Sequence, residues 1–276
     1  MSQTFVPWIV GAWFAVFLLL GQNVSTVLLG AGLVGILLWV GPRVLDGIIG
    51  PDIFYTASIY SLSIIPLYLL MAQLLLRGGV IVDLYRVAHK LAGYRRFPLG
   101  VSTILTGGLL GAVCGSGSAS AAALATLAAP ELERVGYTRR FSIGLAAVSG
   151  SLSAIIPPSL IVIIYGSITN VPIGHLFIGL VGPGLLCIVV YIACLKFFGE
   201  VRPGVADGVA IEEHEDPQTF RRSVGAFIFV VALMVVVFGG IYGGVITVAE
   251  AGAIGAFTAL VGMIVMRRVS VKDIFD

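Results

Sequence analysis

The sequence predicts an all-α polytopic membrane protein with an inverted-repeat fold of the ion-transporter type, and three observations lead there. First, 58% of the 276 residues are hydrophobic and only 11% are charged, whereas soluble domains carry about 25% charged residues. Second, the apolar residues gather in runs that approach the ~20 residues a spanning helix needs. Third, small residues and prolines interrupt two of these runs at the depth expected for the membrane interior, which predicts a re-entrant helical hairpin and a discontinuous helix.

Seven runs are candidate membrane spans, and the positive-inside rule sets their expected direction. The runs are Phe5–Leu20, Val24–Val40, Thr56–Leu76, Phe141–Thr169, Leu176–Phe198, Ser223–Gly240 and Glu250–Met266. With a periplasmic N-terminus, 15 of the 16 Lys and Arg residues fall inside and only Arg43 lies outside. After the third run, the spacing of apolar residues in Val80–Leu91 predicts an amphipathic helix on the inner membrane surface, with a solvated loop helix as the alternative.

The segment Phe97–Pro130 contains no charged residue, yet arginines flank it on both sides. Both flanks are therefore expected inside, so the segment must enter the membrane and return. Its 34 residues are too few for two full spans and a turn. This favours a re-entrant hairpin over residues 97–135 with its tip at Cys114–Ser120, and Ser118 or Ser120 is expected to cap the second arm. A plain Gly/Ser turn or a small-residue packing seam is the simpler alternative.

The run over 141–169 is predicted to be a broken helix. The sequence SGSLS at 149–153 is followed by IPPS at 156–159. Two prolines remove two backbone donors and expose carbonyl groups one turn earlier. Carbonyls at the C-terminal end of a half-helix suit Na⁺, and N–H groups at an N-terminal end suit a carboxylate. The alternative is a simple proline kink.

The order of these segments suggests two units of opposite orientation. Residues 1–198 would form a first repeat that consists of three spans, the hairpin, the broken helix and a closing span at 176–198, and 199–222 would be a cytoplasmic linker. Residues 223–276 would begin a second, inverted repeat, because Gly252 and Gly255 repeat the spacing of Gly32 and Gly35 on a run that enters from the other side. We therefore expect a chain that is incomplete or is completed by another polypeptide.

The composition also excludes several kinds of chemistry. No Asp, Glu, Lys, Arg or His falls in Phe97–Pro130 or Phe141–Thr169, so a proton relay through buried carboxylates is unsupported. The three cysteines have no metal-site or disulfide spacing, and no hydrolase, metalloprotease or ATP-binding motif appears. We expect no enzyme and no cofactor other than a coupling ion. His89, His175 and His214 are expected on the surface, and Glu250 is expected to cap its helix.

Five stretches carry a resemblance to a known family. They are PLYLLMAQLLLRGGV, GSGSASAAALATLAAPELERVGYTRRF, SAIIPPSLIVIIYG, LFIGLVGPGLL and YGGVITVAEAGAIGA, between Pro66 and Ala256. Together they resemble the large membrane subunit of tripartite ATP-independent periplasmic (TRAP) transporters, the DctM-like family. In two places the sequence departs from the family pattern: Gly117 separates Ser116 from Ser118, where the family more often has Gly-Ser-Ser, and Val248 replaces a proline. Family members also continue well beyond the length of this chain.

The resemblance implies a bacterial inner-membrane importer of a small organic anion, such as a C4-dicarboxylate or a sugar acid, that works by Na⁺ symport and an elevator mechanism. It also implies two partners: a small four-helix membrane subunit and a periplasmic substrate-binding protein. A stand-alone Na⁺-coupled symporter or antiporter of the same fold, and a structural membrane anchor, are the alternatives. The sequence names neither the substrate nor the Na⁺ stoichiometry.

The candidate site combines the hairpin tip and the broken helix. The candidate sodium- and substrate-binding residues are Gly115, Ser116, Gly117, Ser118, Ser149, Gly150, Ser151, Pro157, Pro158 and Ser159. Backbone oxygens around Ser116, Gly117, Gly150 and Pro157 would hold Na⁺, because neither segment offers a charged ligand.

Overall fold

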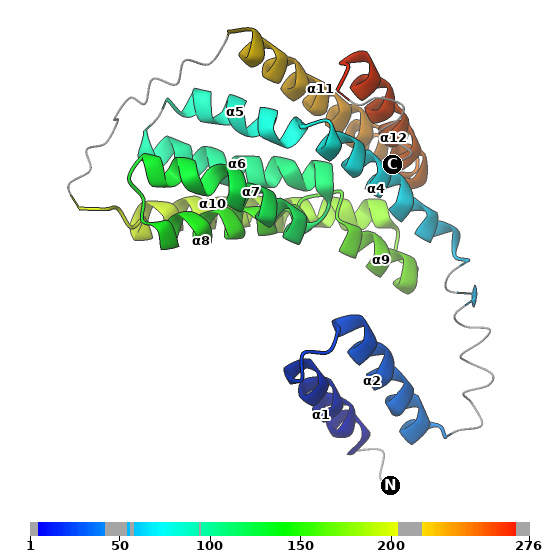
Figure 1. The fold of residues 1–276 in the computed structure, drawn as a ribbon. Helices are drawn as coiled ribbons and strands as arrows, with labels where there is room; N and C mark the ends of the chain where they lie inside the picture. Colours follow the sequence, from blue (N-terminus) through cyan, green and yellow to red (C-terminus); the bar gives the residue numbers. More distant parts are fainter. Residues whose placement is uncertain (1–4, 42–53, 56–57, 94, 204–216, 269–276) are drawn as a thin grey trace. The chain divides into compact units, whose positions relative to one another are not determined.

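The computed structural model describes residues 5–41, 54–55, 58–93, 95–203 and 217–268 (Figure 1). The chain forms two compact units, residues 1–59 and 60–276. The described residues form helices, with a single isolated β-bridge between Tyr137 and Val201. The predicted all-α class is therefore confirmed.

The first unit is a pair of apolar helices, α1 (Val6–Leu19) and α2 (Val24–Trp39). Their bounds agree with the first two predicted runs to within a residue. The helices pack where a small residue meets a large one, since a Cβ added at Gly30 would lie 3.1 Å from the indole nitrogen of Trp13. Most other side chains of the pair are exposed, which suits helices that face lipid.

The second unit begins with a bend that the sequence analysis missed. A short 3₁₀ turn, η3 (Tyr60–Ser63), leads into α4 (Ile64–Arg77), which bends by 63° into α5 (Val80–Ala92). The predicted span Thr56–Leu76, of which residues 56–57 lie outside the described residues, differs from the structure: α4 has 14 residues and reaches spanning length only together with α5. The bend occurs at Gly79, whose φ of +70° suits glycine.

Helix α5 is amphipathic as predicted, but its polar residues do not all face outward. Asp83 and His89 are buried, so the expected surface position of His89 is wrong. The reason is that both side chains meet polar partners on other helices: Asp83 accepts a hydrogen bond from Ser223, and His89 Nε2 lies 3.5 Å from a carboxylate oxygen of Glu131. The polar face of this helix is thus partly an interior contact.

The segments predicted to form the hairpin and the broken helix follow as α6 (Arg96–Cys114), α7 (Gly117–Arg134), α8 (Arg139–Ser151), the 3₁₀ turn η4 (Leu152–Ala154) and α9 (Leu160–Thr169). Thr138 caps α8, because its hydroxyl accepts a hydrogen bond from the N–H of Phe141. Helix α6 is central: it contacts α4, α5, α7, α8 and α10 (Figure 1). Its side chains at Leu99, Ile104 and Leu110 are fully buried.

Three long apolar helices complete the unit. They are α10 (Ile173–Phe198), α11 (Pro217–Tyr242) and α12 (Val248–Val265). Helix α11 begins inside the predicted linker 199–222, of which residues 204–216, including His214, lie outside the described residues. Within the described ranges, only α10, α11 and α12 are individually long and apolar enough to span a membrane, and the bent pair α4–α5 makes a possible fourth.

The glycines noted in α12 serve helix packing. A Cβ added at Gly252 would lie 2.9 Å from the Tyr68 ring, and one at Gly255 would lie 2.8 Å from the Met71 sulfur. Helices α12 and α4 therefore approach closely through small residues, as membrane helices commonly do. The inverted-repeat interpretation of this spacing stays a prediction.

Candidate functional site

The hairpin tip is a two-residue turn. Helix α6 ends at Cys114, Gly115 adopts a left-handed conformation with φ of +59°, and Ser116 is the extended residue that precedes α7. The prediction that Ser118 or Ser120 caps this arm is wrong, because the helix starts at Gly117 and Ser116 takes the N-cap position. Its hydroxyl lies 3.3 Å from that of Ser118 and makes no capping hydrogen bond to the backbone.

The broken helix opens between Ser151 and Leu160. The N–H groups of Ile155 and Ile156 both donate to the Leu152 carbonyl, at 3.0 and 2.8 Å. Pro157 and Pro158 then follow, joined by a cis peptide bond. Since proline has no N–H, the carbonyl groups four residues earlier cannot receive the hydrogen bond that would continue the helix. Backbone oxygens are thus available at the end of η4.

The tip contacts the break directly. The N–H of Leu160 donates a hydrogen bond to the Gly115 carbonyl oxygen at 3.4 Å. A Cβ added at Gly115 would lie 2.6 Å from the Pro158 carbonyl oxygen, and one at Gly117 would lie 3.3 Å from the Ala154 Cβ. Only glycine at 115 therefore permits this approach, both for its φ and for its missing side chain.

The arms of the hairpin hold the broken helix just as closely. A Cβ added at Gly107 would lie 2.2 Å from the Ser149 carbonyl oxygen, and one at Gly111 would lie 2.6 Å from the Ser153 Cα. The other arm, α7, is equally close: a Cβ added at Gly150 of α8 would lie 2.2 Å from the Ala121 Cα. Gly107 and Gly111 are one helical turn apart, and so are Ser149 and Ser153. The two glycines of α6 therefore form a continuous contact surface for the end of α8 and for η4.

Three hydroxyl groups in this region are buried without a hydrogen-bond partner within the described residues: Ser120, Ser149 and Ser159. Their neighbours differ, because Ser153 donates to the Gly150 carbonyl and Ser151 to the Val148 carbonyl, both at 2.7 Å. A buried hydroxyl without a partner costs about 1–3 kcal/mol. It also has lone pairs available, so it is suited to coordinating a cation.

The structure brings together only part of the predicted site. Gly115, Gly117, Ser151 and Pro158 lie at the contact between the tip and the break. Ser149 and Gly150 lie in the last turn of α8, where Ser149 is against Gly107 and Gly150 is against Ala121. Of the remaining candidates, Ser116 is half-buried and Ser118 is exposed at the tip, whereas Pro157 and Ser159 are buried at the break.

The available ligands are neutral oxygens. No group of three or more His, Cys, Asp or Glu residues that could hold a metal ion occurs in the part of the chain that the structure describes. Hard cations prefer oxygen ligands, and the tip and break supply carbonyls and hydroxyls. The arrangement therefore suits a weakly bound monovalent cation better than a tightly held divalent one.

A buried carboxylate outside this site escaped the sequence analysis. Asp83 accepts hydrogen bonds from the Ser223 hydroxyl at 2.6 Å, from Arg86 Nη1 at 3.3 Å and from Arg268 Nη1. Arg268 also donates to the Gly78 carbonyl at 3.1 Å. The network ties α5 to α11 and to the end of α12. Only the Asp83–Arg86 spacing is a local signal; the other partners are distant in the sequence.

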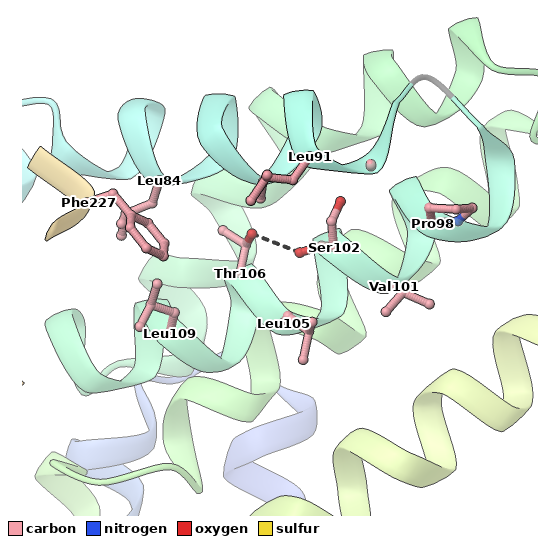
Figure 2. A pocket seen from close by; sticks show the side chains of 11 residues that line it. Leu84, Leu91, Pro98, Val101, Ser102, Leu105, Thr106, Leu109 and Phe227 are labelled. Atoms are coloured by element: carbon pink, nitrogen blue, oxygen red, sulfur yellow. Dashed lines mark hydrogen bonds between the residues drawn. The ribbon is translucent and has the colours of Figure 1, made fainter. Parts of the chain in front are cut away.

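A groove between α5 and α6 lies apart from the candidate residues. It has a volume of about 430 Å³, and Leu84, Leu105, Leu109 and Phe227 are among its apolar lining residues (Figure 2). The two hydroxyl groups that line it already donate hydrogen bonds to backbone carbonyls of α6: Thr106 donates to Ser102 and Ser102 donates to Leu99, both at 2.8 Å. None of the ten candidate residues lines it, so it is not the predicted site.

Comparison with known proteins agrees with the resemblance. The profile of the family described as "Tripartite ATP-independent periplasmic transporter, DctM component" matches residues 12–276. The C4-dicarboxylate TRAP transporter large permease protein of Pseudomonas aeruginosa is 31% identical over 223 residues, covering 80% of this chain and 51% of the relative. The ectoine large permease protein of Halomonas elongata is 32% identical over 216 residues, covering 78% and 49%.

A third relative, the sialic acid TRAP transporter large permease protein of Vibrio cholerae, is 27% identical over 218 residues, covering 79% of this chain and 50% of the relative. The chain thus spans about half the length of these curated relatives. Because the family profile covers nearly all of the sequence, the chain belongs to the DctM family of large permease components of tripartite ATP-independent periplasmic transporters.

Proposed function

We propose that this chain contributes the first half of the transport site of a TRAP-type secondary transporter. In this proposal the transporter imports a small organic anion by Na⁺ symport with an elevator mechanism. The observation that carries the proposal is the contact between the Gly115 carbonyl and the Leu160 N–H. It joins two interrupted helices where backbone groups are released from helical hydrogen bonding, as at the midplane sites of secondary transporters.

Neutral oxygens support Na⁺ as the coupling ion. Ser149 and Ser159 have buried hydroxyls without partners in the described structure, and the two prolines leave carbonyls free nearby. A cation bound by these groups would offset the cost of burying them, because each would gain the interaction it lost with water. Carbonyls around Ser116, Gly117, Gly150 and Pro157 would complete the coordination.

The elevator mechanism is supported by the way the hairpin holds the broken helix. The glycines of α6 and α8 leave almost no space between the two segments, so they are suited to moving as one body. Such a body would carry the site across the membrane against the remaining helices. The anion would then bind at the same tip and break. There, the N–H groups at the N-terminus of helix α7 would be available to a negatively charged group.

The names of the relatives support a proposal for substrate class and partners. The matched permease proteins belong to transporters named for C4-dicarboxylate, ectoine, isethionate and sialic acid. We infer that a small carboxylate or sulfonate is imported, that a periplasmic binding protein selects it, and that a small four-helix membrane subunit completes the permease. The complex would reside in the bacterial inner membrane with the N-terminus of this chain in the periplasm.

The test is uptake by the complete complex reconstituted in liposomes, with and without an inward Na⁺ gradient. We expect uptake to require the gradient, and Ser149→Ala or Ser159→Ala to raise the Na⁺ concentration needed for half-maximal uptake several-fold. Ser142→Ala is the matched control, because Ser142 is also buried and unpartnered among the described residues but lies two turns before Ser149 on α8. Uptake that is indifferent to Na⁺ would refute the coupling.

A further inference from the structure

A groove that none of the ten candidate site residues lines opens between α8 and α10. Its volume is about 540 Å³. Helix α8 supplies one wall and helix α10 the other, and the apolar lining includes Phe141, Leu145, Val148, Val190, Leu195 and Phe198. Gly144 also lines it, and a Cβ added there would meet nothing within 4 Å. The groove is therefore open where a side chain would otherwise fill it.

Two charges of opposite sign lie at one end of this groove. Arg140 is near the start of α8 and Glu200 follows the end of α10, and both line the groove. Arg140 is exposed and has no hydrogen-bond or ion-pair partner among the described residues. The Glu200 carboxylate accepts one hydrogen bond from Thr138, at 3.2 Å. A cation and an anion are thus both available to a ligand at this end.

The other end of the groove is apolar except for one hydroxyl group. Val148 and Val190 line it there, together with Tyr191, whose hydroxyl lies 3.3 Å from that of Ser151. From Arg140 to Val148 the wall is about 12 Å long at 1.5 Å per helical residue. One leaflet of a bilayer has a hydrocarbon depth of about 15 Å. The groove therefore matches one acyl chain that starts from a headgroup at Arg140.

We propose that this groove binds one phospholipid whose headgroup carries both a phosphate and an ammonium group, as in phosphatidylethanolamine. The phosphate pairs with Arg140, since guanidinium groups bind phosphate through charge-assisted hydrogen bonds. The ammonium group faces Glu200, and one acyl chain fills the groove as far as Tyr191. A purely anionic headgroup fits less well, because Glu200 would face it without a compensating cation.

The experiment uses Cys194, which lines the groove and is exposed. The purified chain is stripped of lipid and given phosphatidylethanolamine, phosphatidylglycerol or diacylglycerol with matched acyl chains. Maleimide modification at Cys194 is then measured by peptide mass spectrometry. We expect phosphatidylethanolamine to slow modification at least fivefold, phosphatidylglycerol to slow it less, and diacylglycerol to have no effect. Equal protection by all three, or by none, would overturn the proposal.

Variants separate headgroup recognition from general coating by lipid. Gly144→Leu fills the groove and should abolish the protection, whereas Gly179→Leu on α10, another glycine with open space around it that does not line the groove, should keep it. Glu200→Gln keeps an acceptor for Thr138 and should bring protection by phosphatidylglycerol up to that by phosphatidylethanolamine. Unchanged lipid preference in this variant, or full protection in Gly144→Leu, would contradict the assignment.

Discussion

The backbone N–H of Leu160 donates a hydrogen bond to the carbonyl oxygen of Gly115, 45 residues earlier by their numbers, at 3.4 Å. The bond joins the turn of the hairpin to the start of the second half of the broken helix. Each partner is at a place where helical hydrogen bonding stops. The proposed function depends on this relationship, because it brings free backbone groups of two segments to one place.

Gly115→Ala should destabilise the protein more than a Gly→Ala change at another position of positive φ that has open space around it. Alanine in the left-handed conformation costs about 1–2 kcal/mol, and its Cβ would lie 2.6 Å from the Pro158 carbonyl oxygen, which adds a similar overpacking cost. Gly93→Ala is the control, because Gly93 has φ of +64° but open space around it. Unfolding in detergent measures both variants, and equal losses would argue against the tip contact.

Removing the unpartnered hydroxyls should not destabilise the protein in the absence of Na⁺. Ser149→Ala and Ser159→Ala each remove a buried group that has no partner in the described structure, which relieves a cost of about 1–3 kcal/mol. Ser153→Ala should instead lose about 1 kcal/mol, because its hydroxyl donates to the Gly150 carbonyl. Chemical unfolding in potassium buffer measures the sign of the change in unfolding free energy for each variant. Destabilisation of all three variants would contradict this description of the hydroxyls.

Asp83→Ala should be among the most destabilising single changes. It would leave the Arg268 side chain, which is 10% exposed, without its carboxylate partner, and breaking a buried pair costs about 3–5 kcal/mol. Glu133→Ala removes a more exposed pair with Arg202 and should cost about 1 kcal/mol or less. Comparable losses of unfolding free energy for the two variants would show that the Asp83 network is not an interior contact.

Thr247→Ala should weaken the start of α12. The Thr247 hydroxyl accepts a hydrogen bond from the Glu250 N–H, and the Glu250 carboxylate accepts one from the Thr247 N–H at 2.7 Å. Loss of such a capping box costs about 1 kcal/mol. Thr126→Ala, an exposed threonine within α7 that bonds only to its own helix, should change the unfolding free energy by less than half of that.

The sequence predicts the interruptions well because their causes are local. Gly115 ends a helix through its own φ, and two consecutive prolines break one through their missing N–H groups, so both signals are visible without knowledge of the fold. The capping role of Glu250 is equally local, since its partner Thr247 is three residues away. These expectations needed no tertiary information.

The interior position of Asp83 could not be predicted in the same way. Its partners Ser223 and Arg268 are 140 and 185 residues away, and on α5 alone it occupies the polar face of an amphipathic helix. The N-cap of α7 was misassigned for another reason: several serines in the tip have the right chemistry, and the structure starts α7 at Gly117, so that Ser116 takes the N-cap position.

The most direct test of the account is the effect of Na⁺ on the stability of the purified chain. Unfolding temperatures are measured in sodium chloride and in choline chloride at equal ionic strength, for the unmodified protein and for the Ser149→Ala/Ser159→Ala double variant. A ligand at 100 times its Kd stabilises the folded state by about 2.7 kcal/mol. We predict that sodium raises the unfolding temperature of the unmodified protein and leaves that of the double variant unchanged. Equal sodium effects on both proteins, or none on the unmodified protein, would contradict an ion site between the hairpin tip and the broken helix.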